Sequence, residues 1–279
     1  MQELEELVAK TVHLPSVPQA LVRLQETIAM PEASVADAVK ILEDDPGLAA
    51  KCLQVANSAA YGLRVRSSSL RHASAVLGLR ALRDIALQTS LVASYSHLKK
   101  YSGFQLGRFW KHATVTGVIA KQIARCSRFL RGVDIDAMTS AGLLHNMGRL
   151  AMLDAFRDEY LRVIHPVGSR GSLAVRAERE AFGFDHALAG SVLASRWKMG
   201  DEIICTARDH HLNGDDVAPI AQLIGFANET AHLVIDHGER ALRGALASPE
   251  AVRFQIREDA MEILVETIVM SADQAATYA

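Results

Sequence analysis

The most informative segment of this chain runs from Ala141 to Leu150 and reads AGLLHNMGRL. Apart from His145, Asn146 and Arg149 it is apolar, which predicts a buried helical segment that carries polar groups into a protein core. A histidine followed by an aspartate would offer a divalent metal an imidazole nitrogen and an anionic oxygen. Asn146 offers only a neutral carbonyl dipole in place of that oxygen. The segment therefore looks like a metal-binding element from which the key charge has been removed.

Helical spacing of apolar residues continues on both sides of this stretch, and alternation with a period of two is rare. No proline occurs between Pro46 and Pro166, so no proline breaks a helix in that interval. The sequence therefore predicts an all-α protein, a helical bundle of two lobes. The polar segment from His97 to Gln105 contains Gly103 and is the best candidate for the boundary between the lobes.

We expect an N-terminal helical lobe at residues 1–100, a second lobe at residues 101–240 and a C-terminal helical extension at residues 241–279. Hydrophobic residues make up 49% of the 279 residues and charged residues 22%. This is ordinary globular composition, and a chain of this length buries a substantial core.

Capping signals predict several helix boundaries. One of the serines at 67–69 is expected to cap a helix that Gly78 interrupts, and Ser172 to cap a helix that reaches Glu180. Residues 137–153, which include the opening stretch, are expected to form one buried helix.

Composition also limits the cellular setting. No apolar stretch approaches 18 residues, so no membrane span is expected, and the acidic start of the chain is unlike a secretory signal. The three cysteines, Cys52, Cys126 and Cys205, are far apart and form no CxxC motif. We therefore expect reduced core cysteines in a cytoplasmic protein.

The net charge of −2 conceals an uneven distribution of charged residues. Thirteen Lys or Arg residues and one acid, Asp84, lie between Arg64 and Arg131, whereas the remainder holds 17 bases and 31 acids. A basic middle segment could meet an anionic partner, or its bases could lie on several helix faces and pair with acids elsewhere. No cluster of base-reading residues marks a recognition helix, so nucleic-acid binding is not expected.

Five histidines of the expected second lobe stand near the starts or middles of separate predicted helices. They are His112, His145, His186, His210 and His211. Helical bundles build metal sites from inward side chains on facing helices, although lone histidines at such places are usually satisfied core or surface residues. Spacing alone leaves both interpretations open.

The order of these histidines, followed by Ala227-Asn228, resembles the HD superfamily of metal phosphohydrolases, whose pattern reads His, His-Asp, His, His, Asp. Motifs in the first lobe narrow the match. They are Leu14-Pro-Ser-Val-Pro18, Asp44-Asp-Pro-Gly-Leu48, Val55-Ala-Asn-Ser-Ala-Ala-Tyr-Gly62 and Ser69-Leu-Arg-His-Ala-Ser-Ala-Val-Leu-Gly78. With them the chain resembles, over roughly residues 14–235, the HDOD family, a bacterial signalling branch of that superfamily.

The resemblance implies a degenerate site. Asn146 stands at the first aspartate position of the HD pattern, and Asn228 at the last. Each lost carboxylate removes an attraction to a divalent metal on the order of several kcal/mol at an effective dielectric near 20. No carboxylate is left to act as a general base, and a bound water would be poorly activated. We therefore expect no metal, no cofactor and no catalytic residue.

Arg149 takes the place of a lysine that often follows the glycine in His-Asp-x-Gly-Lys. Together with His112, His186 and His210 it could bind an anion such as phosphate or a nucleotide. Alternatively, Arg149 pairs with Asp154 or with a carbonyl at a helix C-terminus.

The sequence thus predicts a non-catalytic bacterial regulatory protein of signal transduction that binds a protein partner or a small anionic ligand. Candidates for the vestigial pocket are His112, His145, Asn146, Arg149, His186, His210, His211 and Asn228. The HDOD-like segment begins by residue 14 and fewer than fifty residues follow it, so we expect the input to come from a separate protein or ligand. The sequence is compatible with an oligomer. The alternative is a metal-dependent phosphohydrolase, acting on nucleotides or phosphodiesters, with an unusual ligand set.

Overall fold

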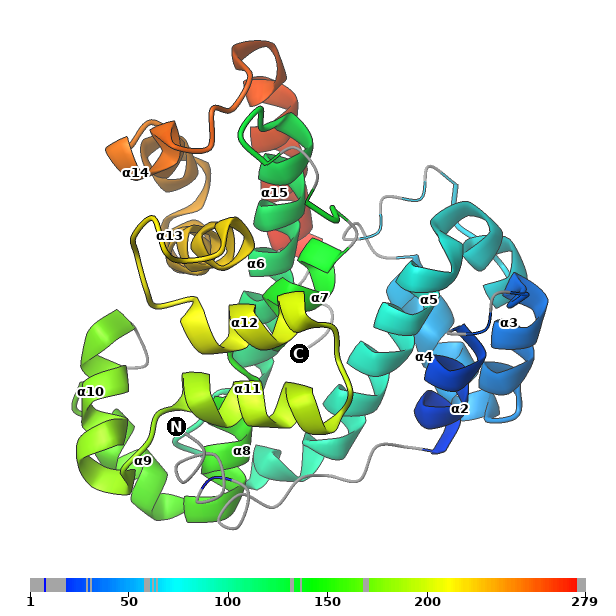
Figure 1. Ribbon diagram of the computed structural model, residues 1–279, viewed down its shortest axis with the longest axis horizontal. Helices are drawn as coiled ribbons and strands as arrows, with labels where there is room; N and C mark the ends of the chain where they lie inside the picture. Colours follow the sequence, from blue (N-terminus) through cyan, green and yellow to red (C-terminus); the bar gives the residue numbers. More distant parts are fainter. Residues whose placement is uncertain are drawn as a thin grey trace. The chain divides into compact units, whose positions relative to one another are not determined.

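The computed structural model describes residue 8 and residues 19–28, 30, 32–57, 61, 63, 65–130, 133–135, 137–167 and 171–274. All named elements in these ranges are helices, and an isolated antiparallel bridge joins Ser127 to Ile256 (Figure 1). The all-α fold class is therefore confirmed. The motif at residues 14–18 lies outside the described residues. No helix in the described ranges is long and apolar enough to cross a membrane.

The chain divides into two compact units. One is Pro15–Ser96, and the other combines Met1–Leu14 with His97–Ala279. The division falls at the short 3-10 helix η1 (Ser96–Lys100), where the sequence places the end of its first lobe. Residues 241–279, expected as a separate extension, belong to the larger unit.

The smaller unit is built on one long helix. Helices α2 (Gln19–Ile28), α3 (Val35–Glu43) and α4 (Pro46–Ala56) pack against α5 (Leu70–Ser94), as Figure 1 shows. The side chain of Ser69 accepts a hydrogen bond from the His72 amide and caps α5. Gly78 interrupts α5 with a φ of 88°, a conformation that costs glycine little. Both features confirm the expectations for this segment.

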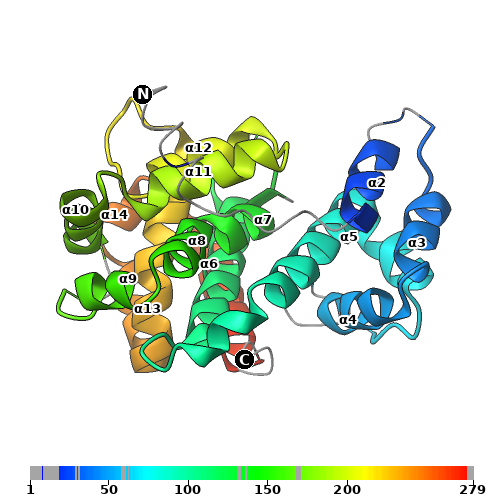
Figure 2. The ribbon, with the colours of Figure 1, turned by 90° about the horizontal axis from the view of Figure 1, so that it is seen from below.

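The larger unit is organised around α6 (Leu106–Cys126), which is buried along most of its length and packs against α7, α13 and α15. Its remaining helices are α7 (Ala137–Leu144), α8 (Met147–Phe156), α9 (Asp158–Ile164), α10 (Gly171–Phe182), α11 (His186–Arg196), α12 (Asp201–Asp209), α13 (Pro219–Leu246), α14 (Pro249–Val252), η2 (Glu258–Ala260) and α15 (Met261–Gln274). Within this unit α11 packs against α8 and α12, which Figures 1 and 2 show side by side with it.

The expectation of one helix over residues 137–153 is wrong. The helix ends at Leu144, and α8 begins at Met147. The cause is local, because Nδ1 of His145 lies 2.6 Å from the carbonyl oxygen of Gly142. In an uninterrupted helix that carbonyl would accept the amide of Asn146. The side chain of His145 thus binds the Gly142 carbonyl that a continuous helix would use, and the chain turns at His145 and Asn146.

Two smaller expectations also need correction. Ser172 does not cap α10, because that helix already includes Gly171. All three cysteines are free, but only Cys52 is buried, whereas Cys126 and Cys205 are partly exposed. Cys126 and Cys205 are therefore not core residues, because their positions on α6 and α12 leave them partly exposed to solvent.

Candidate functional site

The larger unit brings the eight candidate residues together from six places in the fold. His112 comes from α6, His145 and Asn146 from the α7–α8 junction, Arg149 from α8, His186 from the start of α11, His210 and His211 from the end of α12, and Asn228 from α13. All are buried except His211, which is partly exposed. Contacts join seven of them into two groups, which meet where the ring centroids of His145 and His210 are 5.0 Å apart, and Arg149 lies beside both.

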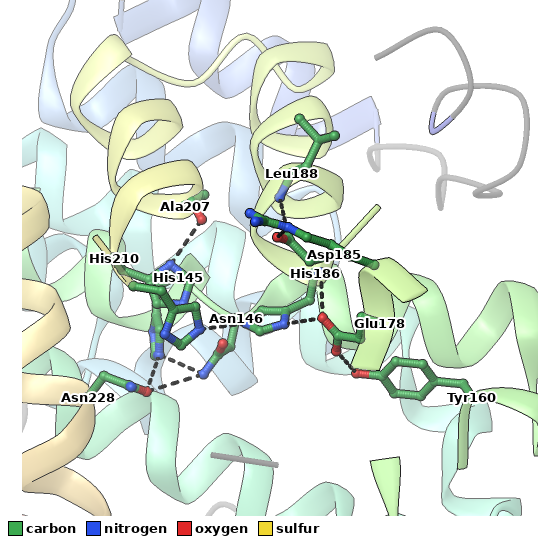
Figure 3. Close-up of polar contacts among 12 residues, drawn as sticks. His145, Asn146, Tyr160, Glu178, Asp185, His186, Leu188, Ala207, His210 and Asn228 are labelled. Atoms are coloured by element: carbon green, nitrogen blue, oxygen red, sulfur yellow. Dashed lines mark hydrogen bonds and ion pairs between the residues drawn. The ribbon is translucent and has the colours of Figure 1, made fainter. Parts of the chain in front are cut away.

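The first group is an amide centre made of His112, His145, Asn146 and Asn228. The Oδ1 atom of Asn228 lies 2.9 Å from Nε2 of His112 and 2.9 Å from Nε2 of His145. The Asn146 amide nitrogen donates to His145 Nε2 at 2.7 Å. Figure 3 shows His145, Asn146 and Asn228 directed toward one another. The two residues at the aspartate positions of the HD pattern are therefore in the centre, as neutral amides.

The two imidazoles of the amide centre are neutral at neutral pH. Burial lowers the pKa of His145 to about 4 and holds the pKa of His112 well below its ordinary value, and Arg149 adds to both effects. Since Nδ1 of His145 donates to the Gly142 carbonyl, its Nε2 carries a lone pair. The contact with Asn228 Oδ1 then joins two acceptors, and the Asn146 amide nitrogen lies 2.7 Å from His145 Nε2 and 3.4 Å from Asn228 Oδ1.

An asparagine can resolve this conflict without a metal. The NH₂ group of Asn146 can donate to both atoms, and Oδ1 of Asn228 still accepts from His112 Nε2. An aspartate has no hydrogen to donate and would require a proton or a metal ion. The amide centre therefore does not fit a hard divalent cation, because its oxygens are neutral and a buried arginine repels positive charge.

The second group is a histidine trio made of His186, His210 and His211. Their available nitrogens lie within 4.8 Å of one another, and the Nε2 atoms of His186 and His211 are 2.9 Å apart. Nδ1 of His210 lies 3.0 Å from the Ala207 carbonyl, which leaves its buried Nε2 without a hydrogen-bond partner among the described residues. Three convergent imidazole nitrogens match the donor set of a zinc-type ion, so this trio fits a late transition metal better than the amide centre does.

Glu178, which no motif in the sequence marks as a site residue, supports the trio from the side opposite the converging nitrogens. Its Oε2 lies 2.6 Å from His186 Nδ1 and accepts the His186 backbone amide at 2.8 Å, while its Oε1 accepts the Tyr160 hydroxyl at 2.8 Å (Figure 3). Burial by itself raises the pKa of Glu178, but the charge and hydrogen bonds of His186 lower it to about 2. The carboxylate accepts from His186 Nδ1 and so leaves Nε2 directed at His211, the arrangement of carboxylates behind metal-binding histidines.

Arg149 is a buried cation without a direct ion-pair or hydrogen-bond partner among the described residues. Its exposed fraction is 5%, its Nε has no hydrogen-bond partner, and no ion pair or side-chain hydrogen bond joins it to any described residue. Asp154, which the sequence offers as a partner, instead pairs with His97 at 2.8 Å. The alternative in which Arg149 merely pairs within the fold is therefore wrong for the described residues.

Arg149 lines a pocket of about 350 Å³ together with His112 and Asn146 of the amide centre. His232, one turn beyond Asn228 on α13, also lines it and stacks on His112 with a centroid distance of 4.0 Å. Its spacing of four from Asn228 places it on the same helix face, a signal from which the sequence could have found it.

Glycines allow the helices of the site to approach this closely. A Cβ atom at Gly148 would overlap the carbonyl oxygen of His186 and lie 2.6 Å from the Gly190 amide nitrogen. A Cβ atom at Gly225 on α13 would likewise overlap the carbonyl oxygen of His210. The backbones of α8 and α13 therefore touch the residues that carry the histidine trio.

A helical unit with ordered histidines at an HD-type centre defines a protein of the HD-like class. The chain belongs to the HDOD family, because the model of the HDOD domain matches residues 14–213.

Three proteins with which the chain shares sequence or fold are as follows. It is 24% identical over 220 residues to an uncharacterized protein of Treponema pallidum, covering 78% of this chain and 42% of that relative. The fold is similar to that of a proposed phosphohydrolase from Shewanella amazonensis, with a TM-score of 0.77, 21% identity and 98% of both chains covered. It is also similar to a proposed signal transduction protein from Marinobacter aquaeolei, with a TM-score of 0.71, 18% identity, and 99% of this chain and 65% of that chain covered. At these identities the two structures establish the fold.

Proposed function

We propose that this HDOD chain is a non-catalytic regulatory module of bacterial, cytoplasmic signal transduction whose degenerate HD centre binds a small anionic ligand. The observation that supports the proposal is that neutral amides replace the carboxylates of the centre while a buried cation lies beside them. Both aspartate positions hold neutral amides, and the fixed charge beside them is the buried cation Arg149. A site of this kind attracts anions and repels divalent metals.

The amide centre lacks the carboxylate ligands and the general base that metal-dependent hydrolysis requires. Two carboxylates at about 4 Å from a divalent ion would each contribute on the order of 8 kcal/mol of attraction at an effective dielectric near 20. Asn146 and Asn228 contribute no charge of this kind. Glu178 cannot serve as a general base in their place, because three hydrogen-bond donors already occupy its two oxygens and its low pKa makes it a weak base.

A signalling role draws support from the family and from the name of one structural neighbour. The HDOD match covers most of the chain, and the Marinobacter aquaeolei protein is described as a proposed signal transduction protein. In this proposal the anionic ligand is the input and a protein partner receives the output.

The proposal is tested by phosphate-ester hydrolysis. Purified protein is incubated with bis(p-nitrophenyl) phosphate and with nucleoside monophosphates in the presence of Mn²⁺, Fe²⁺ or Zn²⁺, beside His145→Ala and a no-enzyme control. The expected result is no turnover above the no-enzyme control. Metal-dependent turnover that disappears in His145→Ala would refute the proposal.

The histidine trio favours a second candidate, a metal-dependent phosphohydrolase with an all-imidazole ligand set. Glu178 behind His186 and the unpartnered Nε2 of His210 are the observations that support it. This candidate requires turnover that depends on the trio, so hydrolysis lost in His186→Ala and retained in His145→Ala would favour it over the first.

A further inference from the structure

The pocket beside the amide centre combines one unpaired cation with apolar walls. Its polar lining includes Arg149, His112, Asn146, His232, Gln105 and His165, and its apolar lining includes Phe104, Phe109, Leu161 and Ile235. A second arginine at the pocket, Arg108, is already paired with Asp236. Arg149 is therefore the pocket arginine that no described carboxylate contacts directly; its charge reaches Glu178 and helps to lower the pKa of that residue, but the oxygens of Glu178 are occupied by Tyr160 and His186.

A buried charge without a counter-ion destabilises a fold unless an additional group neutralises it. The guanidinium of Arg149 cannot release its proton at neutral pH to escape this cost. Its position in a pocket wall lets a ligand supply the missing negative charge. Arg149 thus requires an anionic acceptor, and carboxylates and phosphates are the groups that match a guanidinium in geometry.

Two further buried atoms in the same pocket distinguish these acceptors. Asn146 Oδ1 and His112 Nδ1 have no hydrogen-bond partner among the described residues. Asn146 Oδ1 accepts hydrogen bonds, and so does Nδ1 of a His112 whose Nε2 donates to Asn228. A carboxylate only accepts and would leave both atoms unsatisfied. A phosphomonoester has acceptor oxygens and, near its second pKa of about 6, also a hydroxyl that donates.

The remaining volume and walls indicate the rest of the ligand. A pocket of about 350 Å³ is at the small end of ligand sites and suits one ring with one phosphate better than a dinucleotide. Phe104 and Phe109, whose ring centroids are 5.8 Å apart, offer aromatic surface for such a ring.

We propose that this pocket binds a ring-bearing phosphomonoester of the size of a nucleoside monophosphate, with its phosphate on Arg149 and its ring against Phe104 and Phe109. The inference rests on the proposed function in one respect, since the ligand stays intact only if the centre does not hydrolyse it. It names the class of ligand, the residue that selects the phosphate and the aromatic side chains that receive the ring.

The test is isothermal titration calorimetry of the full chain with AMP, GMP, CMP and UMP, beside adenosine and inorganic phosphate. At least one monophosphate is expected to bind with a Kd below about 1 mM and at least about tenfold more tightly than adenosine or phosphate alone. Arg149→Met should weaken that binding by about tenfold or more, since a hydrogen bond to a charged group is lost. Arg243→Met, which removes an arginine of α13 paired with Glu239 and Glu262 outside the pocket, should leave it unchanged.

Thermal unfolding of the same variants gives a second readout. Without ligand, Arg149→Met should unfold at the same or a higher temperature than the wild type, because a buried unpaired charge is gone. With ligand, the wild type should gain stability and Arg149→Met should not. Should Arg149→Met fail to fold, Asn146→Asp replaces it, since a carboxylate in the pocket wall should weaken phosphate binding equally.

The outcomes separate this inference from the proposed function. Failure of all four monophosphates to bind, or equal binding by wild type and Arg149→Met, would overturn the inference and leave the non-catalytic proposal standing. Binding accompanied by release of inorganic phosphate in the same sample would support the ligand class and refute the non-catalytic proposal.

Discussion

Nε2 of His145 lies 2.9 Å from Oδ1 of Asn228, and neither side chain carries a charge at neutral pH. In an HD enzyme the corresponding contact would be between an imidazole and a carboxylate that share a metal ion. Here the Asn146 amide nitrogen, 2.7 Å from His145 Nε2, supplies the hydrogen that the imidazole lone pair needs. We infer that the side chains of this centre can satisfy one another without a metal ion.

Restoring both carboxylates should restore the need for a cation. In the double variant Asn146→Asp/Asn228→Asp, two buried carboxylates face each other across His145, so the metal-free protein should unfold at a lower temperature than the wild type. Added Mn²⁺ should raise the unfolding temperature of the variant and not that of the wild type. Thermal denaturation with and without Mn²⁺ measures this, and equal Mn²⁺ effects on both proteins would show that the amides are not what excludes metal.

Acid should destabilise the protein through its buried histidines. The pKa of His145 is about 4 in the folded chain and near 6.5 when unfolded, so the unfolded state binds more protons between these values. The contribution of His145 to the free energy of unfolding is fully present above about pH 6.5. It is lost as the pH decreases toward 4, and it amounts to on the order of 3 kcal/mol for His145 alone. Urea denaturation at a series of pH values measures the slope of the free energy of unfolding against pH.

The slope should decrease in His145→Asn and remain unchanged in His237→Gln, which alters an exposed histidine of α13. A free energy of unfolding that stays constant over the window would contradict the burial of a neutral His145.

Glu178 should be one of the costliest side chains to remove. Glu178→Ala leaves His186 and Tyr160 without their buried partner and should lower the free energy of unfolding by about 3 kcal/mol or more. Glu180→Ala, two residues further along α10, removes an exposed carboxylate and should change stability by less than about 0.5 kcal/mol. Denaturant titration of the two variants provides the comparison, and similar losses for both would mean that the network around Glu178 is not a structural support.

The close contact of α8 with α11 should tolerate no side chain at Gly148. Gly148→Ala places a methyl group against the His186 carbonyl and should destabilise the fold by about 2 kcal/mol or more. Gly244→Ala, in α13 with no heavy atom within 4 Å of the added methyl, should be neutral or stabilise by about 0.5–1 kcal/mol. Chemical denaturation of both glycine variants checks the difference, and an unchanged midpoint for Gly148→Ala would exclude the close packing described here.

Local signals in the sequence were sufficient for the helical class and for several helix ends. The cap at Ser69 and the interruption at Gly78 depend on neighbouring residues, so the sequence contains them. The break between α7 and α8 was not predictable in this way, because it depends on the rotamer of His145 and its bond to the Gly142 carbonyl. An apolar run with helical spacing gives no sign of that competition.

The residues of the candidate site could be predicted from the sequence where they form the HD pattern. They could not be predicted where their role depends on tertiary contacts. The eight candidate residues converge as a set, because the HD pattern fixes their order along the chain. Glu178 and Tyr160 occupy helices whose sequences look solvent-exposed, and only packing buries them beside His186. The unpaired state of Arg149 could not be predicted either, since Asp154 was an equally plausible partner until its bond to His97 was known.

The central claim is that the amide centre holds no metal. The most direct test is elemental mass spectrometry of the wild-type chain, His145→Ala and His186→Ala, each purified without added metal or chelator. We predict near-zero metal that depends on His145, and any metal lost only in His186→Ala would belong to the histidine trio. One or two equivalents of iron, manganese or zinc per wild-type chain that disappear in His145→Ala would contradict the claim.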